Sequence, residues 1–162
     1  MIEEIMTAER VIFGCGNTLF GDDGFGPAVV RRLKEEVDLP RGVAVEDVGT
    51  SIGDLLFDLA LSPDGPRTIW IVDAVRLEGR EPGEVFELEL EDIPQEKRAD
   101  FSMHQFPAIN LLQELRLKGG REIRILAVQS EPLPEEVRPG LSRPAEAAVD
   151  EAVRILRESV CQ

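Results

Sequence analysis

The chain has 162 residues, a formal net charge of −14 at pH 7, 43% hydrophobic residues and only 5% aromatic residues. This length predicts a single domain, residues 1–162, with a mainly aliphatic core. The negative charge argues against nucleic acid and against an anionic membrane surface as partners. Because the only cysteines are Cys15 and Cys161, and no apolar stretch approaches the ~18 residues of a transmembrane helix, we expect a cytoplasmic protein.

Short apolar stretches alternate with helical patterns along the first half of the chain. Thr68–Val72 is almost wholly apolar, which is typical of a strand that helices cover on both faces. Residues 1–10 form a polar lead-in in which no element is predicted. The patterns predict strands at Val11–Phe13, Val43–Val45 and Thr68–Val72, and helices from Pro27 to about Leu39 and over Ile52–Leu61.

The second half continues this alternation. Val85–Leu90 places apolar and acidic residues in turn, which predicts an antiparallel strand at or near a sheet edge. The patterns also predict a strand at Ile123–Val128, helices within Phe101–Leu117 and over Pro144–Val160, and loops at Ile93–Asp100 and Glu131–Arg143. We therefore expect an α/β three-layer sandwich: a mostly parallel, twisted sheet of about five strands, one of them antiparallel, with helices on both faces.

Acidic residues follow the first three predicted strands. Asp22 and Asp23 come after the first strand, Asp47 after the second and Asp73 after the third. Because ligands of such sheets bind outside the carboxyl ends of the strands, we expect these positions to meet on one rim. Two carboxylates about 5 Å apart repel by roughly 3 kcal/mol at an effective dielectric constant near 20, so the rim should take up a proton or a cation.

The loop after the first strand begins like a dinucleotide-binding turn, with Gly14 and Gly16. A complete turn of that kind needs a third glycine where this chain has Leu19, and the loop has no lysine for a Walker-type phosphate site. Its two aspartates would also repel phosphates, so a nucleotide is disfavoured. We interpret Asp22 as stabilising the loop or a helix N-terminus, and Cys15 as a small buried residue.

The only histidine, His104, precedes a predicted helix. It can belong to a capping turn, or it can join Asp23 and Asp73 in a set of two carboxylates and one imidazole that suits nickel or zinc. Asp73 can equally be a carboxylate that accepts hydrogen bonds from neighbouring N–H groups at the start of a loop. The sequence contains no visible Ser-His-Asp or H-E-x-x-H arrangement.

Several segments occur in the same order as in a known family. They are Gly14–Gly26 (GCGNTLFGDDGFG), Asp47–Thr50 (DVGT), Ile71–Ala74 (IVDA) with Pro82-Gly83 beyond it, and His104 ahead of Leu111-Leu112. On these segments the chain resembles the hydrogenase maturation endopeptidases, and most closely the branch that serves F420-reducing hydrogenases. The resemblance implies an aspartyl-type endopeptidase that removes the C-terminal extension of the [NiFe] hydrogenase large-subunit precursor after nickel insertion.

The resemblance also implies roles for individual residues. The positions that would contact nickel are Asp23, Asp73 and His104. The positions that would take part in catalysis are Asp23, Asp47 and Asp73. The positions that would bind substrate are Gly49, Thr50 and Ser51. Asp47 is our hypothetical general base for metal-assisted hydrolysis, and Val48 and Ile52 stand where the family has glycines.

The expected cofactor is nickel that the substrate protein supplies, and we expect no tightly bound cofactor of the enzyme itself. The expected partner is the large-subunit precursor. Two other functions stay open at this point: a nickel-binding chaperone or sensor module that does not cut its partner, and a nucleotide-binding α/β module.

Overall fold

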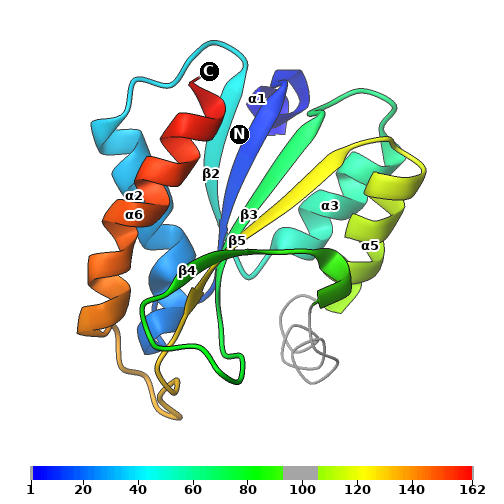
Figure 1. The fold of residues 1–162 in the computed structure, drawn as a ribbon. Helices are drawn as coiled ribbons and strands as arrows, with labels where there is room; N and C mark the ends of the chain where they lie inside the picture. The colour runs from blue at the N-terminus through cyan, green and yellow to red at the C-terminus, as the bar shows by residue number, and fades with distance from the viewer. Residues whose placement is uncertain (1, 93–105, 162) are drawn as a thin grey trace.

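A computed structural model describes residues 2–92 and 106–161, which form a five-stranded sheet with helices on both faces (Figure 1). The strand order is β2-β1-β3-β5-β4. The parallel strands are β1 (Arg10–Cys15), β2 (Val43–Gly49), β3 (Thr68–Val75) and β5 (Glu122–Gln129). Strand β4 (Val85–Leu88) is antiparallel to β5 and lies at the sheet edge, so the predicted α/β sandwich with one antiparallel strand is confirmed.

Helices cover the two faces in separate layers. In Figure 1, α2 (Phe25–Glu36) and α6 (Arg143–Val160) lie to the left of the sheet, and α3 (Ile52–Leu61) and α5 (Phe106–Leu117) lie to the right. Alternate strand residues point into opposite cores: Ile12 and Trp70 contribute to the α2/α6 core, and Phe13 and Ile71 to the α3/α5 core. The two-residue period of the strands thus fills both faces with aliphatic side chains, as the apolar stretches predict.

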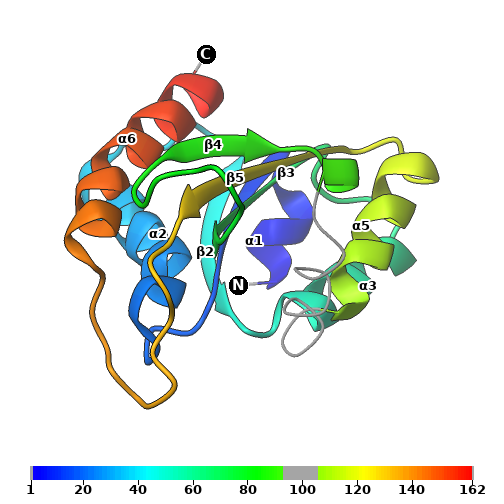
Figure 2. The ribbon, with the colours of Figure 1, turned by 60° about the horizontal axis from the view of Figure 1, so that its bottom comes forward.

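The N-terminal segment differs from the expectation. Residues 2–7 form the short helix α1 (Ile2–Thr7), which packs with the α3/α5 core (Figure 2). Ile5 is fully buried there while the acidic residues of the helix stay exposed. A single buried side chain in a six-residue helix gives no recognisable period, so the sequence pattern could not reveal this element.

Several boundaries also differ from the predictions. Strands β2 and β3 run on to Gly49 and Val75, so Asp47 and Asp73 lie within the last residues of their strands and not after them. Helix α2 ends at Glu36 and not near Leu39. Strand β4 ends at Leu88, and Leu90 is buried from within a short 3-10 helix, η2 (Leu90–Asp92). The predicted loop Ile93–Asp100 lies outside the described residues, and so does the first part of the segment Phe101–Leu117. None of the helices in the described part of the chain is long and apolar enough to cross a bilayer.

A close backbone contact fixes α2 against the sheet. A Cβ added at Gly26 would lie 2.4 Å from the carbonyl oxygens of Cys15 and Val72, and one added at Gly14 would lie 2.5 Å from the carbonyl oxygen of Gly26. Both distances are far below van der Waals contact, so only glycine allows the helix to approach β1 and β3 this closely. This contact positions the loop between β1 and α2, which carries the first acidic residues of the candidate site.

Candidate functional site

Three carboxylates gather at the carboxyl ends of the parallel strands, and we call Asp23, Asp47 and Asp73 the acidic rim. Gly14 of β1 pairs with Asp47 of β2 on one side and with Val72 of β3 on the other. Since adjacent strands lie about 4.8 Å apart, the Cα atoms of Asp47 and Asp73 are roughly 10 Å apart across β1. Asp23 belongs to the 3-10 helix η1 (Gly21–Gly24), which the loop 16–20 joins to the end of β1.

The buried Cys15 thiol lies within electrostatic reach of all three carboxylates of the acidic rim. Burial raises its pKa well above the ordinary value of 9.0, and the negative charges of Asp73, Asp47 and Asp23 raise it further. All three carboxylates therefore lie within electrostatic reach of one sulfur atom, as expected for positions at the carboxyl ends of neighbouring strands. Cys15 is 0% exposed and remains a protonated thiol, as expected of a small buried residue and unlike a nucleophile.

The raised pKa of Cys15 predicts a loss of stability at high pH. Because the folded protein holds the thiol proton that the unfolded chain releases above pH 9.0, the free energy of unfolding should fall above that pH, by at most about 1.4 kcal/mol per pH unit. Denaturant titrations at several pH values should show a smaller fall for Cys15→Ala. An alkylating reagent should modify exposed Cys161 and leave Cys15 unmodified. Equal slopes in both proteins would contradict this prediction.

Asp23 is fixed by the loop that carries it. Its Oδ2 atom accepts a hydrogen bond from the Asn17 N–H at 2.8 Å, and the Asn17 Oδ1 atom accepts one from the Leu19 N–H at 3.0 Å. Gly16 has φ +127°, and a Cβ there would lie 1.9 Å from the carbonyl oxygen of Asp23. The glycines of this loop therefore serve a close turn around a carboxylate, and not a phosphate group.

Asp73 lies near the end of β3 and is only 5% exposed. Its Oδ1 atom accepts a hydrogen bond from the Ala74 N–H at 2.8 Å, which is the local contact expected of a carboxylate at the start of a loop. Strand alternation places it on the same face as Ile71, which belongs to the α3/α5 core. Helix α5 covers that face, and its first residue, Phe106, follows His104 by two positions.

His104 itself lies outside the described residues, so the set of Asp23, Asp73 and His104 stays a prediction. Within residues 2–92 and 106–161, no group of three or more His, Cys, Asp or Glu side chains is arranged to hold a metal ion. The described part of the rim offers carboxylate oxygens, which suit hard or borderline divalent cations, and an imidazole would shift that preference toward nickel or zinc.

Asp47 and the segment after it border a hollow of about 230 Å³. Its lining comprises Gly16, Asn17, Thr18, Pro27, Asp47, Gly49 and Thr50. Asp47 is exposed, and its Oδ1 atom accepts a hydrogen bond from the Gly49 N–H at 2.9 Å, in a turn where Gly49 has φ +54°. Of the three residues expected to bind substrate, Gly49 and Thr50 line the hollow, whereas exposed Ser51 is not part of its lining.

Val48 and Ile52 hold the ends of this turn. They are 9% and 1% exposed and pack into the α3/α5 core. The Ser51 N–H also donates a hydrogen bond to the carbonyl oxygen of Val48 at 2.9 Å. Val48 and Ile52 therefore anchor the turn on both sides, so this chain presents Gly49 and Thr50 from a fixed backbone.

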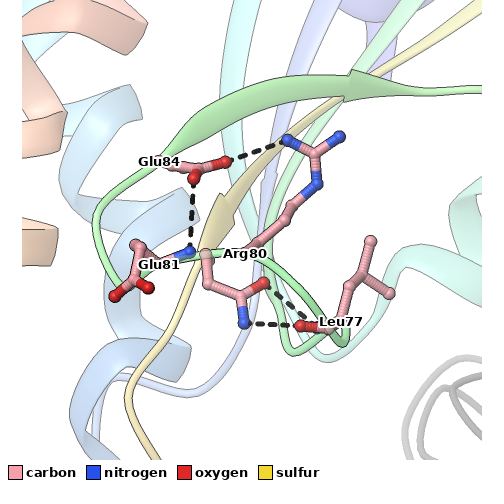
Figure 3. Close-up of polar contacts among 5 residues, drawn as sticks. Leu77, Arg80, Glu81 and Glu84 are labelled. Carbon is pink, nitrogen blue, oxygen red and sulfur yellow. Dashed lines mark hydrogen bonds and ion pairs between the residues drawn. The ribbon is translucent and has the colours of Figure 1, made fainter.

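Gln129 is a positioning residue that the sequence analysis did not single out. It ends β5 and is 5% exposed, and its side-chain amide forms two hydrogen bonds of 3.0 Å with the main chain of Leu77: Oε1 accepts from the N–H and Nε2 donates to the carbonyl. In the same loop, the carboxylate of Glu84 accepts from the Arg80 side chain and from the Glu81 N–H (Figure 3). The loop that follows Asp73 is thereby held against the end of the sheet.

Asp22 joins two loops at this end of the molecule. It is 4% exposed, and its carboxylate accepts hydrogen bonds from the Glu131 N–H at 2.9 Å, the Ser142 N–H at 2.7 Å and the Ser142 hydroxyl at 2.8 Å. The interpretation of Asp22 as a structural residue is confirmed. The helix end that it supports is that of α6, because Ser142 is the N-cap residue of that helix.

The fold and the acidic rim define a class: an α/β protein with acidic residues at the carboxyl ends of a parallel sheet. A family model described as hydrogenase maturation protease matches residues 27–159. The chain is 36% identical over 146 residues to a candidate hydrogenase maturation protease of Methanocaldococcus jannaschii, covering 90% of this chain and 92% of that protein. The chain therefore belongs to the hydrogenase maturation protease family, and it is a peptidase.

Further comparisons agree with this assignment. The chain is 31% identical to the coenzyme F420 hydrogenase subunit delta of Methanothermobacter thermautotrophicus, over 94% of this chain and 95% of that protein. The hydrogenase maturating endopeptidase HybD of Escherichia coli has a similar structure, with a TM-score of 0.69, 26% identity and coverage of 93% and 90%. A HycI protease from Thermococcus kodakarensis, at 22% identity, has the same fold with a TM-score of 0.74 over the full length of both chains.

Proposed function

We propose that this protein removes the C-terminal extension of a [NiFe] hydrogenase large-subunit precursor in the cytoplasm, after nickel has been inserted into that precursor. The observation that carries the proposal is the convergence of Asp23, Asp47 and Asp73 around one buried thiol, beside a hollow that opens at Asp47. Membership of the hydrogenase maturation protease family supports the same reaction class.

The nickel in this proposal belongs to the substrate, and the enzyme carries no tightly bound cofactor. Asp23, Asp73 and His104 recognise the metal in the precursor, which docks the tail across the acidic rim. Asp47 is exposed at the hollow and acts as general base: it takes a proton from the attacking water and returns it to the amine that leaves. Gly49 and Thr50 contact the tail beside the scissile bond, and Ser51 lies next to them in the same turn.

A protein substrate also needs a contact surface beyond the reacting bond. Leu19, Leu133 and Val137 are 46%, 42% and 63% exposed. They come from the two loops that Asp22 joins, and the Arg138 N–H donates a hydrogen bond to the carbonyl oxygen of Leu19 at 2.8 Å. Exposed apolar side chains at this end of an acidic protein favour docking of a folded protein partner over binding of a small ion alone.

The experiment compares nickel-loaded and nickel-free precursors. Given the similarity to an F420 hydrogenase subunit, the large-subunit precursor of an F420-reducing hydrogenase is the first substrate to test. Mass spectrometry after incubation should show a shortened C-terminus for the nickel-loaded precursor and the original mass for the nickel-free one. Binding without shortening would support the chaperone or sensor function, and equal processing of both precursors would exclude nickel as the recognition element.

A further inference from the structure

A groove of about 490 Å³ runs along the outer edge of β2. Its lining combines Thr7 and Ala8, at the end of α1, with Lys34 of α2 and Leu39. Because Ala8 packs in the α3/α5 core and Leu39 packs against the α2/α6 core, the groove lies over the edge of the sheet and not on one of its faces. Figure 2 shows α1 and α2 on either side of β2.

The groove continues into the candidate site along β2. Residues 43–46 of the strand line the groove, and the next residue, Asp47, lines the hollow at the acidic rim. The strand is seven residues long, so it spans about 20 Å at a rise of about 3.3 Å per residue. A single extended chain laid beside β2 would therefore pass through the groove and reach Asp47 without a bend.

The outer side of β2 has no strand partner in the part of the chain that the structure describes. Arg10 of β1 is paired with Val43, and its N–H donates to the carbonyl oxygen of Gly42 at 3.0 Å. In a parallel ladder, Arg10 bonds to the residues on either side of Val43, so the N–H and C=O of Val43 point away from β1. The same orientation repeats at every second residue of β2. Val45 and Asp47 therefore direct their main-chain groups outward.

The side chains of the groove accept a peptide of mixed character. Leu39 and Val43 offer apolar surface. Lys34 is paired with Glu46 at 3.1 Å, and exposed Arg41 has no ion pair with any described residue. The groove is lined by two basic residues and by two acidic ones, Glu4 and Glu46, in a chain with a net charge of −14. The groove lining is therefore neutral overall and adds no repulsion of its own to an acidic segment.

We propose that β2 binds an extended segment of the hydrogenase precursor as an additional strand of the sheet, and that this pairing carries the scissile bond to Asp47. The inference rests on the proposed function for the identity of the peptide. Main-chain hydrogen bonds to Val45 and Asp47 supply affinity, the apolar wall at Leu39 and Val43 accepts alternate side chains, and Arg41 favours an acidic residue opposite it.

The test uses synthetic peptides that carry the residues around the cleavage site of the precursor, with wild-type enzyme. One series is N-methylated at odd positions and the other at even positions, so that each removes every second main-chain donor. The peptides compete with nickel-loaded precursor in the processing assay. Only alternate N–H groups of a strand face the neighbouring strand. We therefore expect one methylated series to inhibit processing at least about tenfold more weakly than the unmethylated peptide. The other series should inhibit as strongly as the unmethylated peptide.

A protein variant with a matched control tests the same pairing from the other side. Val45→Pro removes the outward N–H from an edge strand, where proline is tolerated. Val45→Ala keeps that N–H and loses at least as much of the buried side chain. The KM for nickel-loaded precursor should be at least about tenfold higher in Val45→Pro than in Val45→Ala, with equal kcat. If Val45→Pro does not fold, the peptide series decides.

Hydrogen exchange separates this inference from the proposed function. The amide of Val45 should exchange more slowly when the precursor is present, whether or not the tail is cut. Protection without cutting would overturn the proteolytic function and keep the pairing. If the tail is cut and the two methylated peptide series inhibit processing equally, whether strongly or weakly, the pairing would be overturned and the proteolytic function kept. Protection of residues 43–47 that grows with enzyme concentration alone would assign the edge to a second copy of this chain and overturn the inference.

Discussion

Asp73→Asn should lower the rate of tail removal at least about 100-fold, which corresponds to about 2.7 kcal/mol of transition-state stabilisation. Asparagine keeps the volume of the side chain and an oxygen that can accept the hydrogen bond from the Ala74 N–H. It removes the negative charge that the proposed mechanism uses to hold nickel at the rim. Mass spectrometry of nickel-loaded precursor, sampled over time, measures the effect.

The same change also acts on Cys15, and it needs a matched control. Neutralising Asp73 removes the largest charge effect on the pKa of Cys15, so the thiol pKa should move down while burial still keeps it above 9.0. The matched control is Asp58→Asn, which makes the same substitution on an exposed position of α3 and should leave the rate unchanged. A rate near that of wild type for Asp73→Asn would exclude this carboxylate from catalysis and from metal recognition.

Most of the fold could be predicted because strands and helices leave periods in the sequence. The apolar stretch at Thr68–Val72 predicted a strand with two covered faces, and in the structure this strand lies at the centre of the sheet. The alternation at Val85–Leu90 predicted an antiparallel edge strand, which β4 is. The helix over Ile52–Leu61 has the predicted bounds. Helix α1 was missed because one buried isoleucine makes no period.

The acidic positions of the site could be predicted for a topological reason. The carboxyl ends of β1, β2 and β3 lie at the same edge, which places Asp47 and Asp73 there, and the loop after β1 brings Asp23 to the same edge. The residues that support the rim could not be paired from sequence, because their partners lie far along the chain. Gln129 binds a loop 52 residues away, and Asp22 binds residues 109 and 120 positions away. No local pattern encodes such contacts.

Asp22→Ala should lower the free energy of unfolding by about 3–4 kcal/mol, or roughly 10 °C in Tm for a domain of this size. The change leaves three donors on Glu131 and Ser142 without their carboxylate acceptor in a site that is largely closed to water. Hydrogen bonds to a charged group contribute about 1.5–3 kcal/mol each. The total loss should be smaller than the sum of three such hydrogen bonds, because the N–H of exposed Glu131 can bind water instead. Denaturant titration measures the loss.

Two variants separate the parts of this contact. Asp22→Asn keeps one acceptor oxygen and should cost less than Asp22→Ala, and Ser142→Ala removes the hydroxyl donor together with the N-cap of α6, at about 1 kcal/mol. The double variant Asp22→Ala/Ser142→Ala should lose less than the sum of the single losses, because the two residues bind each other. Strict additivity would show that the hydrogen bond between the Ser142 hydroxyl and Asp22 contributes nothing. Asp22 directly precedes Asp23, so the contact that secures α6 also holds the acidic rim in place. If the coupling is present, we therefore expect Asp22→Ala to remove the tail more slowly than wild type under conditions in which the variant is still folded.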